Sequence, residues 1–146
     1  MCQRLRLVEL AQPSLQVRIY PSTDSNHPFP SYQHFRAGML LDADMLRWFS
    51  GHYLRGPEDR NHPWASPLLA TSFEGLAPAL LRTAGFDPLR DEGPAYADKL
   101  RSAGVEVDYR CYERLIHNYI VMGTASSANR AAVEDLADEL RRWFAR

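Results

Sequence analysis

An aspartate and a histidine are the side chains of this sequence best placed for acid–base chemistry. Asp87 lies in the segment 85–93, and His117 lies 30 residues later in the segment 112–119. A carboxylate beside an imidazole fixes the tautomer of the ring and stabilises the imidazolium that forms when the ring accepts a proton. Asp87 and His117 are therefore the candidate acid and base of a catalytic site, provided that the fold brings them together.

Three predicted strands place both residues at one edge of a sheet. Apolar and polar residues alternate over 15–20 and 105–111, and 79–84 is a short apolar run. Asp87 follows the run 79–84, and His117 follows 105–111. Strands that alternate with helices predict right-handed crossovers and a parallel sheet, whose chemistry lies beyond the carboxyl ends of the strands. Neighbouring strands of such a sheet bring these two loops side by side.

The helices between the strands are predicted from capping residues and apolar periodicity. Asp42 caps a helix over 43–54, Gly104 closes a helix over 90–103, and Ser126 or Ser127 caps the last helix. Apolar stripes on the first and last of these helices are expected to face the core. The stripes consist of Met45, Leu46, Phe49 and Tyr53, and of Val133, Leu136, Ala137, Leu140 and Phe144.

The remaining segments are predicted to be the end of a helix and two loops. Residues 1–11 resemble the tail of an amphipathic helix, which Pro13 ends. Residues 21–38 and 55–77 are rich in proline and polar residues, and we expect loops there. Long loops inside a compact domain are usually functional or disordered.

The composition is that of an ordinary globular domain. The 146 residues suffice for one domain, 1–146, and 45% hydrophobic and 24% charged residues are usual values. The net charge of −1, without a block of Lys and Arg, favours neither a nucleic acid nor an anionic membrane as partner. No apolar run approaches the ~20 residues of a membrane helix. The first ten residues make a poor signal peptide, so we expect a cytoplasmic location.

Neither a metal nor a cofactor is expected. Cys2 and Cys111 make no disulfide framework, and no Cys-x-x-Cys pair is present. The other histidines lack a paired metal spacing such as His-x-x-x-His, so we expect structural or surface roles for them. They are His27, His34, His52 and His62.

Each part of the acid–base pattern also has a plainer interpretation. Asp87 precedes a proline, and Asp before Pro is a common turn. Asp91 and Glu92 are favourable negative charges in the first turn of a helix. A lone loop histidine such as His117 is usually solvated or hydrogen-bonded. The order of further landmarks along the chain favours the catalytic interpretation.

These landmarks resemble those of the hormone-sensitive-lipase-like esterases, a family of α/β-hydrolases. The segment 87–93, Asp-Pro-Leu-Arg-Asp-Glu-Gly, resembles the acid motif of that family. Its first Asp, the triad acid of the family, corresponds to Asp87, and the triad histidine after the next strand corresponds to His117. The similarity runs from about residue 13 to residue 144. Other similar segments, in the family's order, are Ile19-Tyr20-Pro21, Trp48-Phe49, His52-Tyr53-Leu54 and Ser66-Pro67-Leu68.

The resemblance implies the C-terminal part of an α/β-hydrolase fold. Three strands of a mostly parallel sheet with flanking helices would be present, and the N-terminal half of the domain would be missing. The parent protein would hydrolyse a small carboxylic ester by serine attack, without a cofactor or metal. His117 would be the general base and then the general acid, and Asp87 would orient it.

The serine nucleophile of that mechanism is absent from these residues. No two of the eight glycines lie four positions apart, so the Gly-x-Ser-x-Gly elbow is missing. The His-Gly-Gly-type loop of the oxyanion hole is missing too. Loss of the triad serine costs a factor of about 10⁶ in kcat in subtilisin. We therefore predict no esterase turnover from residues 1–146 alone.

Three residues depart from what the resemblance predicts. The family usually has glycine after the triad histidine and three residues before it, where this chain has Asn118 and Arg114. Asn accepts a positive φ better than Arg does. Arg18 lies in a strand that should be buried on both faces, where an unpaired charge is costly.

Three hypotheses for the chain remain open. It is a fragment of an esterase, a truncated non-catalytic protein that acts as an interaction module or has no function, or a subunit that complements a separate serine-bearing chain. In each case the missing strands leave a sheet edge open, through which we expect the chain to self-associate. The natural ester and its acyl-chain length do not follow from the sequence.

Overall fold

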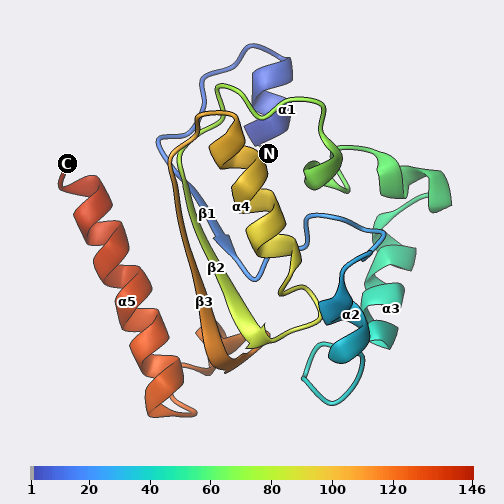
Figure 1. Ribbon diagram of the computed structural model, residues 1–146, viewed down its shortest axis with the longest axis vertical. Coiled ribbons are helices and arrows are strands. Elements are labelled where there is room, and N and C mark those ends of the chain that lie inside the picture. The colour runs from blue at the N-terminus through green and yellow to red at the C-terminus, as the bar shows by residue number, and fades with distance from the viewer. Residues whose placement is uncertain (1) are drawn as a thin grey trace.

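Three parallel strands form the centre of the structure (Figure 1), a computed structural model that describes residues 2–146. The middle strand pairs with one strand on each side, in the order β1-β2-β3. The prediction of a three-stranded parallel sheet with flanking helices is confirmed. The elements are α1 (Cys2–Leu7), β1 (Gln16–Ile19), α2 (Pro30–His34), α3 (Ala43–Tyr53), β2 (Ala79–Phe86), α4 (Glu92–Ser102), β3 (Val107–Ile116) and α5 (Ser127–Phe144), with short 3₁₀ turns at Pro57–Asn61, Pro67–Leu69 and Tyr119–Met122.

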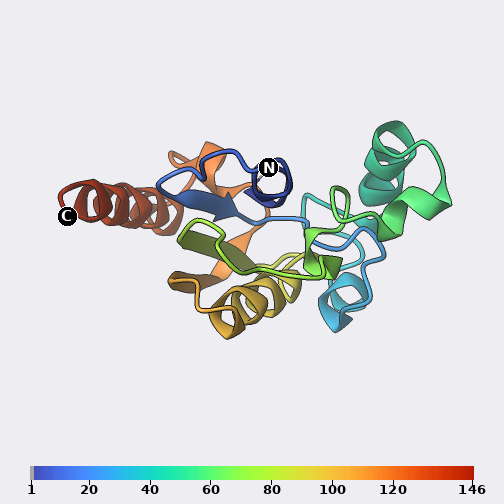
Figure 2. The same ribbon diagram turned by 90° about the horizontal axis from the view of Figure 1, so that it is seen from above.

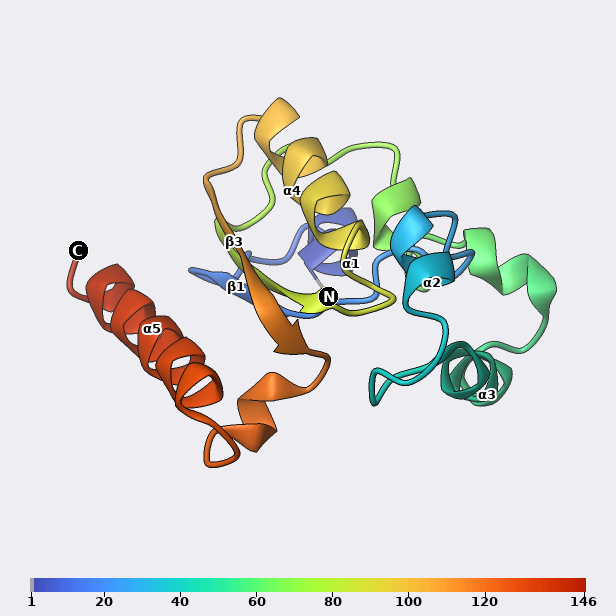
Figure 3. The ribbon, with the colours of Figure 1, turned by 60° about the horizontal axis from the view of Figure 1, so that its bottom comes forward.

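The helices cover the two faces of the sheet. Helices α1 and α4 pack on one face, where Leu81 of β2 lies in a buried cluster with Cys2 and Tyr96. Helix α5 lies on the other face, where Ala84 and Ala132 share a second cluster (Figure 3). The excursion between β1 and β2, which carries α2 and α3, extends beyond the strands at the end of the molecule away from α5 (Figure 2). The site described below lies between this excursion and the sheet.

Two strands are longer than the sequence pattern predicts. β2 continues to Phe86 rather than ending at residue 84, and β3 continues to Ile116 rather than ending at residue 111. The charged residues Glu113 and Arg114 suggest a loop, but both are exposed on a strand at the edge of the described sheet. A polar edge strand satisfies the same pattern. His117 consequently follows the end of β3 directly.

The helix caps are predicted correctly. Asp42 accepts a hydrogen bond from the backbone N–H of Met45, and Ser126 accepts one from that of Asn129. Gly104 adopts a positive φ of 74° after α4. These signals are local, so they do not depend on what packs around them.

Other helix predictions are wrong. Helix α1 ends at Leu7, well before Pro13, and the predicted loop 21–38 contains α2. Of the stripe predicted on α3 only Leu46 is buried, and Phe144 at the end of α5 is 68% exposed. Apolar periodicity identifies the face of a helix that needs a partner, but it does not supply that partner.

The outer edge of β1 has no partner strand in the described part of the chain. Within residues 2–146 β1 pairs only with β2, and Val17 on β1 is 40% exposed. An exposed strand edge with an apolar side chain is a place where another chain can pair.

Within residues 2–146 no helix is both long and apolar enough to span a bilayer.

A charged side chain lies at the centre of the sheet. Arg82 on β2 is 0% exposed and donates from Nη1 to Oδ1 of Asp108 at 2.9 Å. Its Nε and Nη2 have no hydrogen-bond partner in the described part of the chain. Buried ion pairs contribute little net stability, and unpaired buried N–H groups cost free energy.

We predict that Arg82→Leu stabilises the chain. The free energy of unfolding should rise by about 1–4 kcal/mol, because the leucine removes two unpaired donors and Asp108 stays partly solvated. Urea unfolding followed by circular dichroism measures the change. Arg110→Leu, which removes a half-exposed arginine from neighbouring β3, is the control and should change stability by less than about 1 kcal/mol. A loss of stability in Arg82→Leu would show that the buried pair is net favourable.

Candidate acid–base site

The structure brings Asp87 and His117 together. Nδ1 of His117 lies 2.8 Å from Oδ2 of Asp87, and the Asp87 side chain is fully buried. The other carboxylate oxygen accepts the backbone N–H of Leu89 at 2.8 Å. With both oxygens engaged, the carboxylate holds a fixed orientation and favours the tautomer that carries the proton on Nδ1.

The turn after β2 positions Asp87. The register between β2 and β3 shifts between Ala84 and Phe86. A Cβ at Gly85 would collide with the backbone carbonyl of Glu113 on β3, so only glycine permits this close approach. The turn then closes with the N–H of Arg90 donating to the carbonyl of Asp87 at 3.0 Å.

The ring of Tyr20 packs against His117, and an asparagine side chain accepts a hydrogen bond from the tyrosine hydroxyl. The ring of Tyr20, which follows β1, lies 4.5 Å from the imidazole, centroid to centroid. Its hydroxyl donates to Oδ1 of Asn118 at 3.3 Å. Burial and the charge of Asp87 raise the pKa of Tyr20, so its phenol stays protonated. His117 thus contacts both Asp87 and Tyr20.

The two departures from the family pattern in the histidine loop behave differently. Asn118 has a positive φ of 69°, a conformation that Asn accepts better than most residues. Arg114 lies inside β3, and its φ is not positive. The expected backbone difficulty at Arg114 therefore does not occur.

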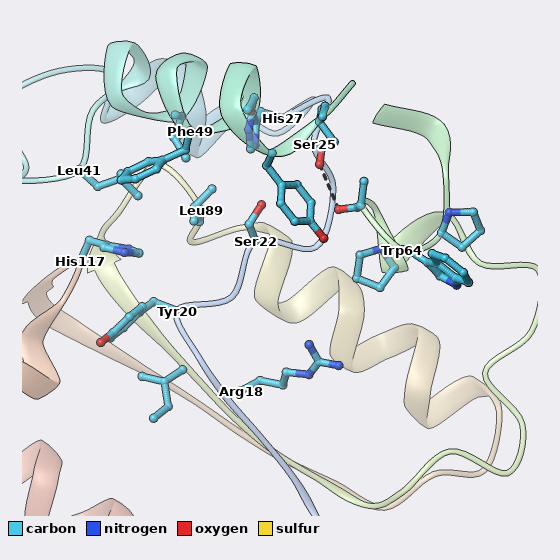
Figure 4. A pocket seen from close by; sticks show the side chains of 18 of the residues that line it. Arg18, Tyr20, Ser22, Ser25, His27, Leu41, Phe49, Trp64, Leu89 and His117 are labelled. Carbon is cyan, nitrogen blue, oxygen red and sulfur yellow. Dashed lines mark hydrogen bonds between the residues drawn. The ribbon is translucent and has the colours of Figure 1, made fainter. Parts of the chain in front are cut away.

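A cavity of about 800 Å³ opens beside His117 (Figure 4). The imidazole of His117 points into it, and Nε2 has no hydrogen-bond partner in residues 2–146. No Asp or Glu among the described residues lines the cavity. Its lining includes Arg4, Arg18, Tyr20, Ser22, Ser25, His27, Leu41, Leu46, Phe49, Tyr53, Trp64, Leu89 and His117.

Arg18, which the sequence places in a buried strand, is half-buried at the cavity wall. Its Nε donates to Oε1 of Gln16 at 3.3 Å, and the guanidinium lies 5.6 Å from the ring centre of Tyr96. No carboxylate among the described residues pairs with it. The charge is therefore only partly compensated.

Glu92 joins the acid turn to the loop that lines the cavity. Its buried carboxylate accepts the backbone N–H groups of Thr23 and Asp24, and His27 Nδ1 lies 2.9 Å from Oε1. Gly93 allows the start of α4 to lie close to β2, because a Cβ there would collide with Thr83. The interpretation of Glu92 as a helix-terminal charge misses this role, since its partners lie 65 to 69 residues away in sequence.

Asp91 fastens the same loop at a second point. Its carboxylate accepts the backbone N–H of Ser31 at 2.9 Å, and Ser31 Oγ donates to the carbonyl of Pro88. Burial alone would raise the pKa of Asp91, but hydrogen bonds from Arg90 and Ser31 lower it overall. Asp87, Asp91 and Glu92 thus each hold a different part of the site.

The remaining histidines form no metal centre. No group of three or more His, Cys, Asp or Glu side chains in the described chain could hold a metal ion. His27 has a structural role against Glu92, and its ring stacks on Tyr32. His52 is exposed, with Nδ1 close to the carbonyl of Trp48.

Comparison with known proteins gives consistent matches. The model of a family described as "alpha/beta hydrolase fold" matches residues 1–121. Carboxylic ester hydrolase LipN of Mycobacterium tuberculosis is 42% identical over 92% of this chain and 36% of its own length. Ethyl acetate hydrolase of Pseudomonas putida is 45% identical over 80% of this chain and 36% of its own length.

Solved structures match the fold as well. Ester-hydrolase EH1AB1 from the metagenome of Lake Arreo superposes with a TM-score of 0.93 and 38% identity, over 99% of this chain and 46% of its own. An esterase of the fungus Rhizomucor miehei superposes with a TM-score of 0.90 and 34% identity, over 98% of this chain and 45% of its own. The chain thus spans less than half the length of each of these four proteins.

We predict that Glu92→Ala releases the loop at Thr23 and Asp24. The two N–H groups lose their acceptor, so the free energy of unfolding should fall by about 2 kcal/mol or more. Hydrogen exchange at these two amides, measured by NMR, should become faster. Glu92→Gln keeps an acceptor oxygen and should lose less.

Asp98→Ala serves as the matched control for this prediction. Asp98 is an exposed carboxylate on the same helix, α4. Its removal should change stability by no more than about 0.5 kcal/mol. Unchanged exchange at Thr23 and Asp24 in Glu92→Ala would contradict the role given to Glu92.

Proposed function

The chain belongs to the hormone-sensitive-lipase-like family of α/β-hydrolases, and on this premise we propose that it carries the acid and base of a Ser-His-Asp carboxylic-ester hydrolase. The chain covers only 36–46% of the relatives described above. Residues 1–146 are in this proposal a partial hydrolase domain, and the nucleophile and oxyanion hole come from the remainder of such a domain. The substrate is a small carboxylic ester.

Asp87 and His117 perform the proton transfers in this mechanism. Nε2 of His117 accepts the proton of the serine hydroxyl as the serine oxygen attacks the ester carbonyl carbon, and then gives that proton to the departing alcohol. Water attacks the acyl-serine with the same assistance. Asp87 keeps the proton of the neutral ring on Nδ1 and stabilises the imidazolium. No metal or cofactor takes part.

One observation carries this proposal. Nδ1 of His117 is engaged by a fully buried carboxylate, and Nε2 has no partner among residues 2–146 and lies at the wall of a cavity. This is the arrangement that a general base needs, with one nitrogen oriented and the other free. The surrounding Leu and aromatic side chains suit the apolar part of an ester.

In this proposal the missing strands of the sheet pair with the open edge of β1. β1 has an unpaired edge in the described chain and bears the exposed Val17. Without a covering partner, this edge pairs with a second copy of the chain.

A truncated, non-catalytic protein is a second candidate. Arg82 in the sheet and Arg18 at the cavity wall are charges that an intact hydrolase core would not need. In this second proposal, selection for activity of the chain is relaxed. The chain would then act as an interaction module or have no function.

We predict that the chain becomes an esterase when the missing part of the domain is supplied. The nucleophile-bearing N-terminal segment of ethyl acetate hydrolase would be fused ahead of α1. A short-chain aryl ester, assayed by release of the phenol, should then be hydrolysed, whereas residues 1–146 alone should show no turnover. In size-exclusion chromatography the fusion should be monomeric and the isolated chain should self-associate.

Variants of the fusion separate the two candidates. His117→Ala should reduce kcat by about 10⁴–10⁶ and Asp87→Asn by about 10⁴. His52→Ala, which removes an exposed imidazole, is the control and should keep full activity. A folded but inactive fusion favours the non-catalytic candidate, and ester turnover by the isolated chain that depends on His117 would contradict the predicted need for a serine.

A further inference from the structure

The base of the site is complete within residues 2–146, even though the nucleophile is not among them. His117 Nδ1 is bound to Asp87, which is fully buried and also accepts the N–H of Leu89. The ring therefore carries its proton on Nδ1 and presents the lone pair of Nε2 to the cavity (Figure 4). A base in this state needs only a substrate with a removable proton.

The cavity suits a flat aromatic molecule. Rings of Tyr20, Phe49, Tyr53 and Trp64 contribute to its lining, and leucine side chains line it as well. Its volume of about 800 Å³ exceeds what one bicyclic aromatic compound requires. The lining and the volume of the cavity beside His117 therefore suit a flat aromatic substrate.

The charge of the cavity favours a product that becomes negative. Arg4 and Arg18 line it, whereas no carboxylate of the described chain does. Neither arginine forms an ion pair within residues 2–146. Ser22 adds a hydroxyl that points into the cavity (Figure 4). A developing phenolate would therefore meet donors and positive charge rather than repulsion.

From these three observations we propose that the chain by itself catalyses proton abstraction from flat aromatic carbon acids, with His117 as the base. The activity shares His117 with the proposed ester hydrolysis but requires no serine. It differs in reaction class, because a C–H bond is broken and no acyl group is transferred.

A benzisoxazole is a suitable probe of this activity. His117 Nε2 takes the proton from C3, and the electron pair of the C–H bond becomes the third bond between carbon and nitrogen. The N–O bond breaks, and the oxygen leaves with its electron pair as a phenolate. The proton then passes from His117 to water, so the reaction is balanced without an oxidant or a second reactant.

The test uses the 146-residue chain and 5-nitro-1,2-benzisoxazole, with the coloured nitrophenolate followed by absorbance. The rate should exceed that of free imidazole at equal concentration by about 10²-fold, the lower range for a positioned general base. It should fall as the pH is lowered, because a protonated imidazole accepts no proton. Indazole, a flat analogue without the N–O bond, should slow the reaction by competing for the cavity.

Variants assign the rate to His117. His117→Gln should lower it to the level of free imidazole, and Asp87→Asn should lower it at least tenfold. His52→Gln removes an imidazole outside the cavity and should leave the rate unchanged. Thermal melting checks that each variant is folded. If a variant does not fold, the pH dependence and the indazole competition of the unaltered chain still test the proposal.

Three results would overturn the inference. They are a rate equal to that of free imidazole, a rate retained in folded His117→Gln, and a rate that indazole does not affect. If the fusion does not hydrolyse esters but the 146-residue chain opens the benzisoxazole ring, only the proposed ester hydrolysis is removed. If the fusion hydrolyses esters but the chain does not open the ring, only this inference is removed.

Discussion

The site depends on a hydrogen bond between a buried carboxylate and an imidazole at the ends of two neighbouring parallel strands. β2 delivers Asp87 and β3 delivers His117, and the parallel register places both ends at the same edge of the sheet. The two strands approach closely at Gly85, where a Cβ would collide with the backbone of Glu113 on β3. Sheet topology and a single glycine thus determine the geometry on which the chemistry relies.

The turn that carries Asp87 also organises the cavity. Asp87 orients His117, Asp91 fastens Ser31, and Glu92 receives the backbone of Thr23 and Asp24. Because these carboxylates follow one another within six residues, the base and the cavity wall share one rigid support. A disturbance of this turn would therefore be expected to affect both parts of the site.

Local signals and strand order were sufficient to predict much of the fold and the contact between Asp87 and His117. The caps at Asp42 and Ser126 depend only on neighbouring residues, and the alternation of strands with helices predicts parallel strands. The partners of Glu92 lie more than 60 residues away, so no local pattern reveals them. The exposure of Phe144 and the full length of β3 depend on what covers a surface, which periodicity alone does not specify.

The protonation state of His117 tests the central claim most directly. NMR of the chain with ¹⁵N-labelled histidine reports which ring nitrogen carries the proton in the neutral form. We expect the proton on Nδ1, protected from exchange by Asp87, and a bare Nε2; Asp87→Ala should abolish this protection. A proton on Nε2, or a signal that Asp87→Ala leaves unchanged, would contradict the account.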